Sequence, residues 1–256
     1  MDFGLKDKVA LITGGARGIG FADAQALGAE GVRIAINEID RHACEHAVKV
    51  LRADGVDAYG FIGDATDEAT VARITHEVAT QLGQIDILVN NAGIGVKPAY
   101  QVADMPVEAW DSMIHSHMKS TFLWSRAVIP HMEKNHFGRI INMSSMNFTG
   151  GGRPGVSHYA AAKAGIQGFT QTLAKEVGPA GITANALAPG YVETELIAQF
   201  SQEMRNLLAK QNPVGRTCKP SEVAALVVFL CSMQAAFING ELICMDGGRR
   251  DYYWGN

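Results

Sequence analysis

The chain has 256 residues, of which 47% are hydrophobic and 19% are charged, and its formal net charge is −4. A chain of this length buries a sizeable core without a disulfide or metal staple, and a slightly acidic balance argues against nucleic acid as the main partner. The N-terminus lacks the apolar segment of a signal peptide, and no run of about 18 apolar residues predicts a membrane span. We therefore expect a cytoplasmic protein with no membrane or nucleic-acid partner.

The four cysteines are far apart in the sequence and form no Cys-x-x-Cys pair; they are Cys44, Cys218, Cys231 and Cys244. This spacing favours reduced thiols over a zinc site or a disulfide framework. The histidines show no metal-ligand spacing either, so no metal is expected.

Short apolar runs alternate with longer amphipathic runs from one end of the chain to the other. In the first half, the pattern predicts a strand over 9–12, a helix over 19–30, a strand over 32–36, a helix from an Asp40 cap to 53, a strand over 58–62, a helix over 67–81 and a strand over 85–89. In the second half, it predicts a helix over 107–134, a strand over 139–143, a helix over 157–177, a strand over 182–187, a helix that Ser221 caps and that runs to 231, and a strand over 242–244.

Apolar strands joined by helices are typical of parallel sheets that are buried on both faces. The sequence therefore predicts an α/β fold, a Rossmann-like, doubly wound parallel sheet of about seven strands with helices on both faces. No linker or repeat divides the chain, so we expect one domain over 1–256. Its cofactor half would be about 1–140 and its catalytic and substrate half about 141–256.

The first predicted strand is joined to the first predicted helix by a glycine-rich segment, Thr13-Gly14-Gly15-Ala16-Arg17-Gly18-Ile19-Gly20. Glycines permit a tight turn and let backbone N–H groups reach a pyrophosphate at the helix N-terminus. The spacing differs from the G-x-G-x-x-G fingerprint, but dinucleotide-binding folds hold phosphate at this place in the βαβ series. We expect cofactor contacts from Gly14, Arg17, Gly18, Ile19 and Gly20.

The second predicted strand leads into Glu38, which lies about 20 residues after the glycine segment. A carboxylate there accepts hydrogen bonds from the adenosine ribose and repels a 2′-phosphate, so Glu38 favours NAD over NADP. Arg17 argues the other way, because a loop arginine can pair with that phosphate. No second basic residue follows Glu38. We expect NAD, with NADP as the alternative.

Four further motifs follow in order along the chain: Asn90-Asn91-Ala92-Gly93, Ser144-Ser145, Tyr159-Ala160-Ala161-Ala162-Lys163 and Pro189-Gly190. With the glycine segment, they make the chain resemble the short-chain dehydrogenase/reductase family from Lys8 to the Asp246-Gly247-Gly248 segment. Each motif is weak alone, but five in this order and spacing are specific. The resemblance implies a nicotinamide-dependent oxidoreductase that forms a homotetramer through the helices of 107–134 and 157–177.

Tyr159 and Lys163 are four residues apart, so on a helix both side chains lie on one face. Lowering the phenol's pKa from about 10 to about 7 needs roughly 4 kcal/mol, which an ammonium about 4 Å away supplies at an effective dielectric constant of about 20. Tyr159 can then accept the hydroxyl proton in alcohol oxidation or return it in ketone reduction. By resemblance, Ser145 hydrogen-bonds the substrate oxygen and stabilises developing charge.

The resemblance also assigns the rest of the cofactor site. It implies that Asp64 and Ala65 contact the adenine, that Asn90 braces the central sheet, and that Lys163 also binds the nicotinamide ribose. It places Ala92 and Gly93 against a ribose, with Asn91 beside them. The carboxamide end would be held by Pro189, Gly190, Val192 and Thr194.

One position departs from the family pattern. Many members carry a catalytic asparagine where this chain has His117, on the helix before the serine strand. That asparagine helps to hold a water that links the lysine to solvent. Either neutral His117 hydrogen-bonds the same water and activity survives with an altered pH profile, or the site is impaired. We expect the first and count His117 with Ser145, Tyr159 and Lys163 as catalytic residues.

Substrate choice in this family lies in variable loops. The segment between Ser145 and Tyr159 contains Met146, Asn147, Phe148 and a glycine run over 150–152, and it is one residue longer than the common pattern. A lid is predicted after Pro189-Gly190, with Tyr191, Leu196 and Phe200. Such residues predict a pocket with apolar and aromatic surface. The residues expected to contact substrate are Ser145, Met146, Asn147, Tyr191 and Leu196.

Three consecutive aromatic residues, 252–254, lie near the C-terminus. They are costly to leave in water, which predicts that they pack at a subunit interface.

These observations predict an NAD(H)-dependent oxidoreductase that interconverts a secondary alcohol and a ketone, on a small cyclic or aromatic substrate. One alternative is an NADP(H)-dependent ketone or 3-oxoacyl reductase, in which Arg17 outweighs Glu38. A second is a nucleotide-binding sensor or assembly protein with little turnover. His117 favours that second alternative, and the presence of Ser145, Tyr159 and Lys163 argues against it.

Overall fold

A computed structural model describes residues 2–149 and 152–249, apart from the side chain of Leu196. Within these residues, seven parallel strands form one sheet in the order β3-β2-β1-β4-β5-β6-β7. The strands are β1 Val9–Thr13, β2 Arg33–Glu38, β3 Ala58–Ile62, β4 Ile87–Asn90, β5 Gly138–Met143, β6 Ile182–Pro189 and β7 Leu242–Met245. The strand order reverses between β1 and β4, which confirms the predicted doubly wound sheet and makes this junction its switch point.

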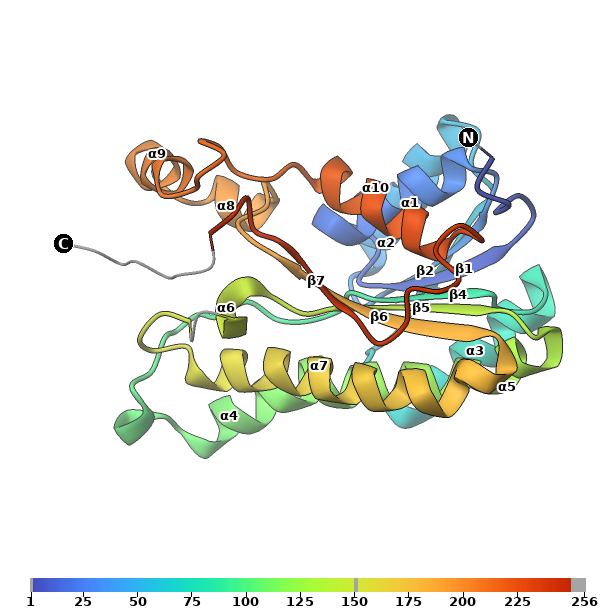
Figure 1. Ribbon diagram of the computed structural model, residues 1–256, viewed down its shortest axis with the longest axis horizontal. Coiled ribbons are helices and arrows are strands. Elements are labelled where there is room, and N and C mark those ends of the chain that lie inside the picture. The colour runs from blue at the N-terminus through green and yellow to red at the C-terminus, as the bar shows by residue number, and fades with distance from the viewer. Residues whose placement is uncertain (1, 150–151, 250–256) are drawn as a thin grey trace.

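Helices cover both faces of the sheet (Figure 1). They are α1 Gly18–Ala29, α2 Arg41–Ala53, α3 Glu68–Leu82, α4 Val107–Ile114, α5 Ser120–Asn135, α6 Met146–Thr149, α7 Ser157–Val177, α8 Glu195–Ala198, α9 Gln202–Lys210 and α10 Pro220–Cys231. One layer holds α1, α2 and α10, and the other holds α3, α5 and α7. Alternate residues of β1 divide between the layers, since Ile12 packs with the first and Leu11 with the second.

Side-chain caps fix where several of these helices begin. Asp40 accepts a hydrogen bond from the Ala43 N–H, and Asp67 does the same for Thr70, so α2 and α3 start where acidic caps satisfy their first-turn donors. The predicted Ser221 cap is wrong. Helix α10 begins at Pro220, and the Glu222 carboxylate accepts from the Lys219 N–H at 2.8 Å.

The predicted helix over 107–134 contains a break that the sequence did not indicate. Between α4 and α5, His115–Lys119 form a π-helical turn, in which the Ser120 N–H donates to the His115 carbonyl five residues earlier. No glycine or proline marks this turn in the sequence. Turns of this kind occur frequently at functional sites, and His117 lies in this one.

None of the described helices is long and apolar enough to cross a membrane. In the same part of the chain, no group of three or more His, Cys, Asp or Glu side chains is placed to hold a metal ion.

Candidate functional site

Two adjoining cavities lie at the carboxyl ends of the central strands. One has a volume of about 680 Å³ and is lined by Ser145, Tyr159 and Lys163. The other, of about 930 Å³, is lined by Gly14, Glu38 and Asp64. Both share five lining residues, which are Ile19, Asn91, Gly93, Ile94 and Thr194. The two cavities therefore form one elongated cleft at the switch point, where doubly wound folds bind dinucleotides.

The glycine segment shapes the middle of the cleft. Gly14 and Gly18 have φ angles of +59° and +55°, a region that side chains rarely adopt. They turn the chain into α1, whose first turn has no side-chain cap and no acidic residue. The backbone N–H groups of that turn are thus left for an anion, which fits the pyrophosphate of a dinucleotide.

Hydrogen bonds fix this segment to the loop after β4. The Thr13 hydroxyl oxygen accepts from the Asn91 and Ala92 N–H groups, both at 3.0 Å. In return, the Asn91 side-chain amide donates to the Gly14 carbonyl at 2.9 Å. Gly20 packs beneath both, because a Cβ there would lie 2.5 Å from the Gly14 oxygen. Asn91 and Gly20 thus act by holding the loop, and of the two only Asn91 lines the cleft.

Acidic side chains dominate the cavity beyond the glycine segment. Glu38 ends β2 and lines it, together with Asp64 and Ala65. Arg17 lines it too, but its guanidinium pairs with the Asp40 carboxylate and lies 4.0 Å from that of Glu195. The pKa of Asp40 is lowered by its hydrogen bond from Ala43 and by Arg17. Among the described residues that line this cavity, Arg17 is the one arginine, and it is already paired with a carboxylate.

Asn90 connects the sheet to the helices on one face. Its side-chain amide donates to Asn142 on β5 at 2.8 Å and to Ser125 on α5 at 3.2 Å. Asn142 in turn donates to Thr170 on α7 at 2.9 Å. This buried chain of bonds fits the bracing role that the resemblance implied for Asn90.

Helix α7 presents Tyr159 and Lys163 to the same cavity. The Lys163 ammonium donates to the Met143 carbonyl at 2.6 Å and lies 5.7 Å from the centroid of the Tyr159 ring. Burial lowers the pKa of Lys163 to about 7. Burial also raises the pKa of Tyr159, although a hydrogen bond with Ser145 acts to lower it. The expected fall in the phenol's pKa is thus not seen in the protein alone, because desolvation outweighs the hydrogen bond with Ser145.

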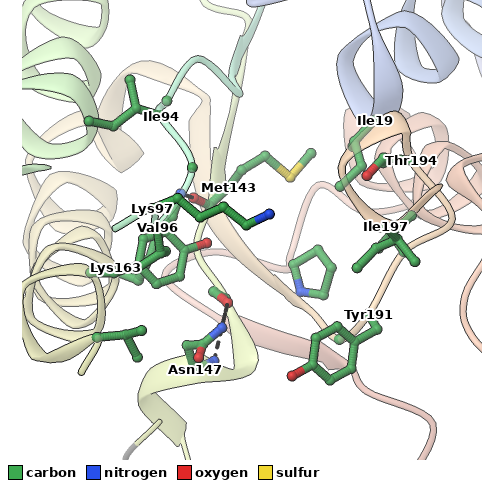
Figure 2. A pocket seen from close by; sticks show the side chains of 18 of the residues that line it. Ile19, Ile94, Val96, Lys97, Met143, Asn147, Lys163, Tyr191, Thr194 and Ile197 are labelled. Atoms are coloured by element: carbon green, nitrogen blue, oxygen red, sulfur yellow. Dashed lines mark hydrogen bonds between the residues drawn. The ribbon is translucent and has the colours of Figure 1, made fainter. Parts of the chain in front are cut away.

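Ser145 lies at the end of β5, where α6 begins. Its hydroxyl oxygen accepts from the backbone and side-chain amides of Asn147, at 3.1 and 3.3 Å (Figure 2). A hydroxyl with both acceptor positions used still has its proton to donate, so Ser145 can donate to a substrate oxygen. Met146 was expected at the substrate wall, but it is buried, and its sulfur lies 2.9 Å from where a Cβ on Gly190 would be.

His117 is 4% exposed and lies at the edge of the catalytic group. Its Nε2 is 3.2 Å from the Ile94 carbonyl oxygen, which can only accept, so Nε2 carries the proton. Nδ1 is then an acceptor, and it has no partner among the described residues. Burial, with the charge of Lys163, holds the pKa of His117 well below its ordinary value despite the bond to Ile94. The imidazole is therefore neutral at pH 7.

The substrate end of the cleft contains residues that sequence reasoning did not find. It is lined by Tyr191, which was expected to contact substrate, and by four residues that were expected at the carboxamide end of the cofactor, Pro189, Gly190, Val192 and Thr194. The additional lining residues include Val96, Lys97, Arg153, Ile197, Gln199 and Met204. Loops and the short helix α8 supply most of them, and these have no periodic pattern to reveal them in the sequence. The predicted roles of the Leu196 side chain, Gly150, Gly151 and the aromatic residues 252–254 lie outside the described residues.

Comparisons with known proteins place the chain in a family. A family model described as enoyl-(acyl carrier protein) reductase matches residues 14–250. The 3-oxoacyl-[acyl-carrier-protein] reductase FabG of Escherichia coli is 38% identical over 241 residues, which cover 94% of this chain and 96% of that protein. A solved Serratia marcescens short-chain dehydrogenase/reductase variant superimposes with a TM-score of 0.90 at 30% identity, covering 96% of this chain and 99% of that one. This chain belongs to the short-chain dehydrogenase/reductase family.

Other short-chain dehydrogenases/reductases that resemble the chain differ in their substrates. BbsD of Thauera aromatica, a (2S)-[(R)-hydroxy(phenyl)methyl]succinyl-CoA dehydrogenase subunit, is 35% identical to this chain over 246 residues. The alignment covers 96% of this chain and 98% of BbsD. A crystal structure from Agrobacterium tumefaciens, proposed to be a gluconate dehydrogenase, has a TM-score of 0.92 and 32% identity, with 98% of each chain covered. As a member of this family, the chain is an oxidoreductase that uses a nicotinamide cofactor.

Proposed function

We propose that the chain is an NAD(H)-dependent oxidoreductase that interconverts a secondary alcohol and a ketone, with Tyr159 as general acid and base. The choice of NAD rests on the cavity that would hold the adenosine end. Glu38 stands at the end of β2, and Arg17 is already paired with Asp40 and near Glu195. A 2′-phosphate placed there would meet these carboxylates without an unpaired arginine to offset them.

The cleft supplies positions for each part of the reaction. When bound, the dinucleotide provides the hydride acceptor for oxidation or the hydride donor for reduction. The first turn of α1 holds its pyrophosphate, while Pro189 and Thr194 line the nicotinamide end beside Tyr159. Ser145 donates a hydrogen bond to the substrate oxygen, and Tyr159 accepts the alcohol proton or returns it to the ketone oxygen. One hydride and one proton together convert ketone to alcohol.

His117 replaces the family asparagine as the group that connects Lys163 to solvent. Its unpartnered Nδ1 is an acceptor that a water next to Lys163 can donate to, and Nε2 is fixed by Ile94. A neutral imidazole serves this role throughout the pH range in which it stays unprotonated.

The cofactor choice is tested by titrating the purified protein with NADH and NADPH while following nicotinamide fluorescence. We expect NADH to bind at least about tenfold more tightly, equivalent to 1.4 kcal/mol. A preference for NADPH would overturn the NAD assignment. If the protein binds neither dinucleotide, the proposed function is overturned. Tyr159→Phe should abolish turnover while leaving NADH binding in place; a protein with no turnover to lose would be a nucleotide sensor.

A second candidate, an NADP(H)-dependent 3-oxoacyl reductase, is favoured by the name of the FabG relatives. The two candidates differ in both cofactor and substrate. Reduction of acetoacetyl-CoA by NADPH at a rate above that with NADH would favour the second.

The expected homotetramer remains a proposal. Val107, Trp110 and Phe122 are exposed on α4 and α5, the helices through which the resemblance implied association. Apolar side chains gathered on one pair of helices suit an interface. Light scattering after size exclusion should give a mass of about four chains; a monomer would contradict this proposal.

A further inference from the structure

The two cavities of the cleft have opposite charge. Among the described residues, the substrate cavity is lined by three basic side chains and no carboxylate. Lys97 and Arg153 are cationic, and Lys163 has a pKa of about 7. The cavity at the adenosine end has one guanidinium, that of Arg17, and five carboxylates, those of Glu38, Asp64, Glu108, Asp111 and Glu195. In a chain with a net charge of −4, a cationic substrate cavity is a local feature that composition does not produce.

Lys97 is placed to act on a ligand inside the cavity. Figure 2 shows its side chain pointing into the cavity from the wall that also holds Val96. Its Nζ lies 5.5 Å from the centroid of the Phe200 ring, which is on the segment between α8 and α9. A ring face attracts an ammonium but carries no net charge, so it positions the cation without neutralising it. The charge of Lys97 remains available to an anion.

The other two basic side chains of the cavity differ in their surroundings. Lys163 is bound to the Met143 carbonyl and belongs to the catalytic group. Arg153, on the segment between α6 and α7, lines the cavity as Lys97 does. The remaining wall is largely apolar, with Val96, Ile197 and Tyr191 among its residues. Such a site suits a ligand with an apolar body and one anionic end.

We propose that the substrate is a free oxo acid or hydroxy acid whose carboxylate is held by Lys97 with the help of Arg153. Its carbonyl or carbinol carbon would lie beside Tyr159 and Ser145. This assignment rests on the proposed function, which it narrows from any secondary alcohol to one class. The carboxylate takes no part in the redox step. It orients the substrate and raises its affinity by charge-assisted hydrogen bonds.

Calorimetric titration of keto acids and their methyl esters tests the proposal, because each ester keeps the carbon chain and ketone of its acid and replaces the charged carboxylate with a neutral group that is one methyl larger. The probes are acetoacetate, 4-oxopentanoate and 5-oxohexanoate, in which the carboxylate moves one methylene farther from the ketone each time. We expect at least one acid to bind about tenfold or more tightly than its ester. If no acid binds better than its ester, including the case in which none binds, the proposal is overturned.

Matched variants locate the contact. Lys97→Gln and Arg153→Gln should each reduce the ratio of acid affinity to ester affinity, by about tenfold for Lys97→Gln. Lys49→Gln, which removes an exposed lysine on α2 outside both cavities, should leave the ratio as it is. An equal fall of the ratio in the Lys49 variant would assign the effect to overall charge and overturn the role of Lys97.

The titrations are run with and without NADH, so that two failures can be distinguished. A protein that discriminates acid from ester but binds no dinucleotide would retain the anion site and lose the proposed function. A protein that binds NADH and reduces the esters as well as the acids, with equal kcat/KM, would keep the proposed function and lose the anion site.

Discussion

The imidazole of His117 meets the ring of Tyr159 edge-on, with the ring centroids 5.3 Å apart and the planes at 80°. This arrangement places the residue that departs from the family pattern directly against the proposed acid and base. The π-helical turn over His115–Lys119 and the bond from Nε2 to Ile94 both fix the imidazole there. The imidazole is therefore a fixed neighbour of Tyr159.

Removing the Nδ1 acceptor should slow the reaction. We expect His117→Leu to lower kcat by about 10²-fold, near the lower end of what a positioned proton-transfer group contributes. Burial holds the pKa of His117 well below its ordinary value, so the part of the fall in wild-type kcat that depends on His117 should begin well below pH 6.5, where Nδ1 gains a proton and can no longer accept. His117→Asn cannot titrate and should lose this acid limb. Steady-state rates of the wild type and the two variants would be compared from pH 5 to pH 9.

NADH affinity serves as the control for these variants, since a structural defect would weaken it as well. If His117→Asn and wild type have the same rate–pH profile, His117 has no part in the proton path.

Gly93 is needed because His117 occupies the space where a side chain would be. A Cβ on Gly93 would overlap the His117 Cε1 and Nδ1 atoms. We expect Gly93→Ala to reduce the free energy of unfolding by about 1–3 kcal/mol through overpacking. In the His117→Ala background, where the imidazole is absent, Gly93→Ala should reduce the free energy of unfolding by much less than it does in the wild type. Urea denaturation of the four proteins gives the coupling, and additive effects would show that the overlap is relieved elsewhere.

Much of the fold follows from periodicity in the sequence. Strand β3 and helix α7 have the same bounds as predicted, because apolar runs and amphipathic spacing report burial directly. The glycine segment and the pair Tyr159 and Lys163 could be placed as well. In both cases a short spacing fixes which atoms face the cleft.

The lining of the substrate cavity was harder to predict from the sequence. Lys97 and Arg153 line it from loops, whose paths depend on tertiary contacts and not on a repeating pattern. Met146 stands next to Ser145 in sequence, but the first turn of α6 directs its side chain into the core. The π-helical turn at His117 has no breaker residue to predict it. Its extra residue per turn is visible only in the hydrogen bonds.

Releasing Arg17 from its carboxylate partner should alter cofactor choice. Asp40→Asn removes the charge that pairs with Arg17 but keeps a side chain that caps α2, so the helix should remain stable. We expect NADPH affinity to rise several-fold relative to NADH, since the guanidinium becomes available to a 2′-phosphate. Fluorescence titration measures both affinities. An unchanged ratio would show that Glu38 alone sets the preference.

Asp23 is a buried acid with no evident role in the site. It lies on α1, which packs against α10, and both of its carboxylate oxygens are buried without a hydrogen-bond partner among the described residues. Burial raises the pKa of this carboxyl well above its ordinary value. Folding at neutral pH therefore requires either proton uptake by Asp23 or burial of its charge, and both reduce stability.

Replacing Asp23 should stabilise the protein, and more so at neutral than at acid pH. The unfolded carboxyl ionises at about pH 3.9, whereas the folded one keeps its proton to a higher pH, so the wild-type free energy of unfolding falls as pH rises between these two values. We expect Asp23→Ala to gain about 1–3 kcal/mol at pH 7 and less at pH 4.5. Asp23→Asn keeps an unpaired polar group and should gain less than Ala. Urea denaturation at the two pH values decides; a gain that is larger at pH 4.5 would show that Asp23 is stabilised by ionisation in the folded protein.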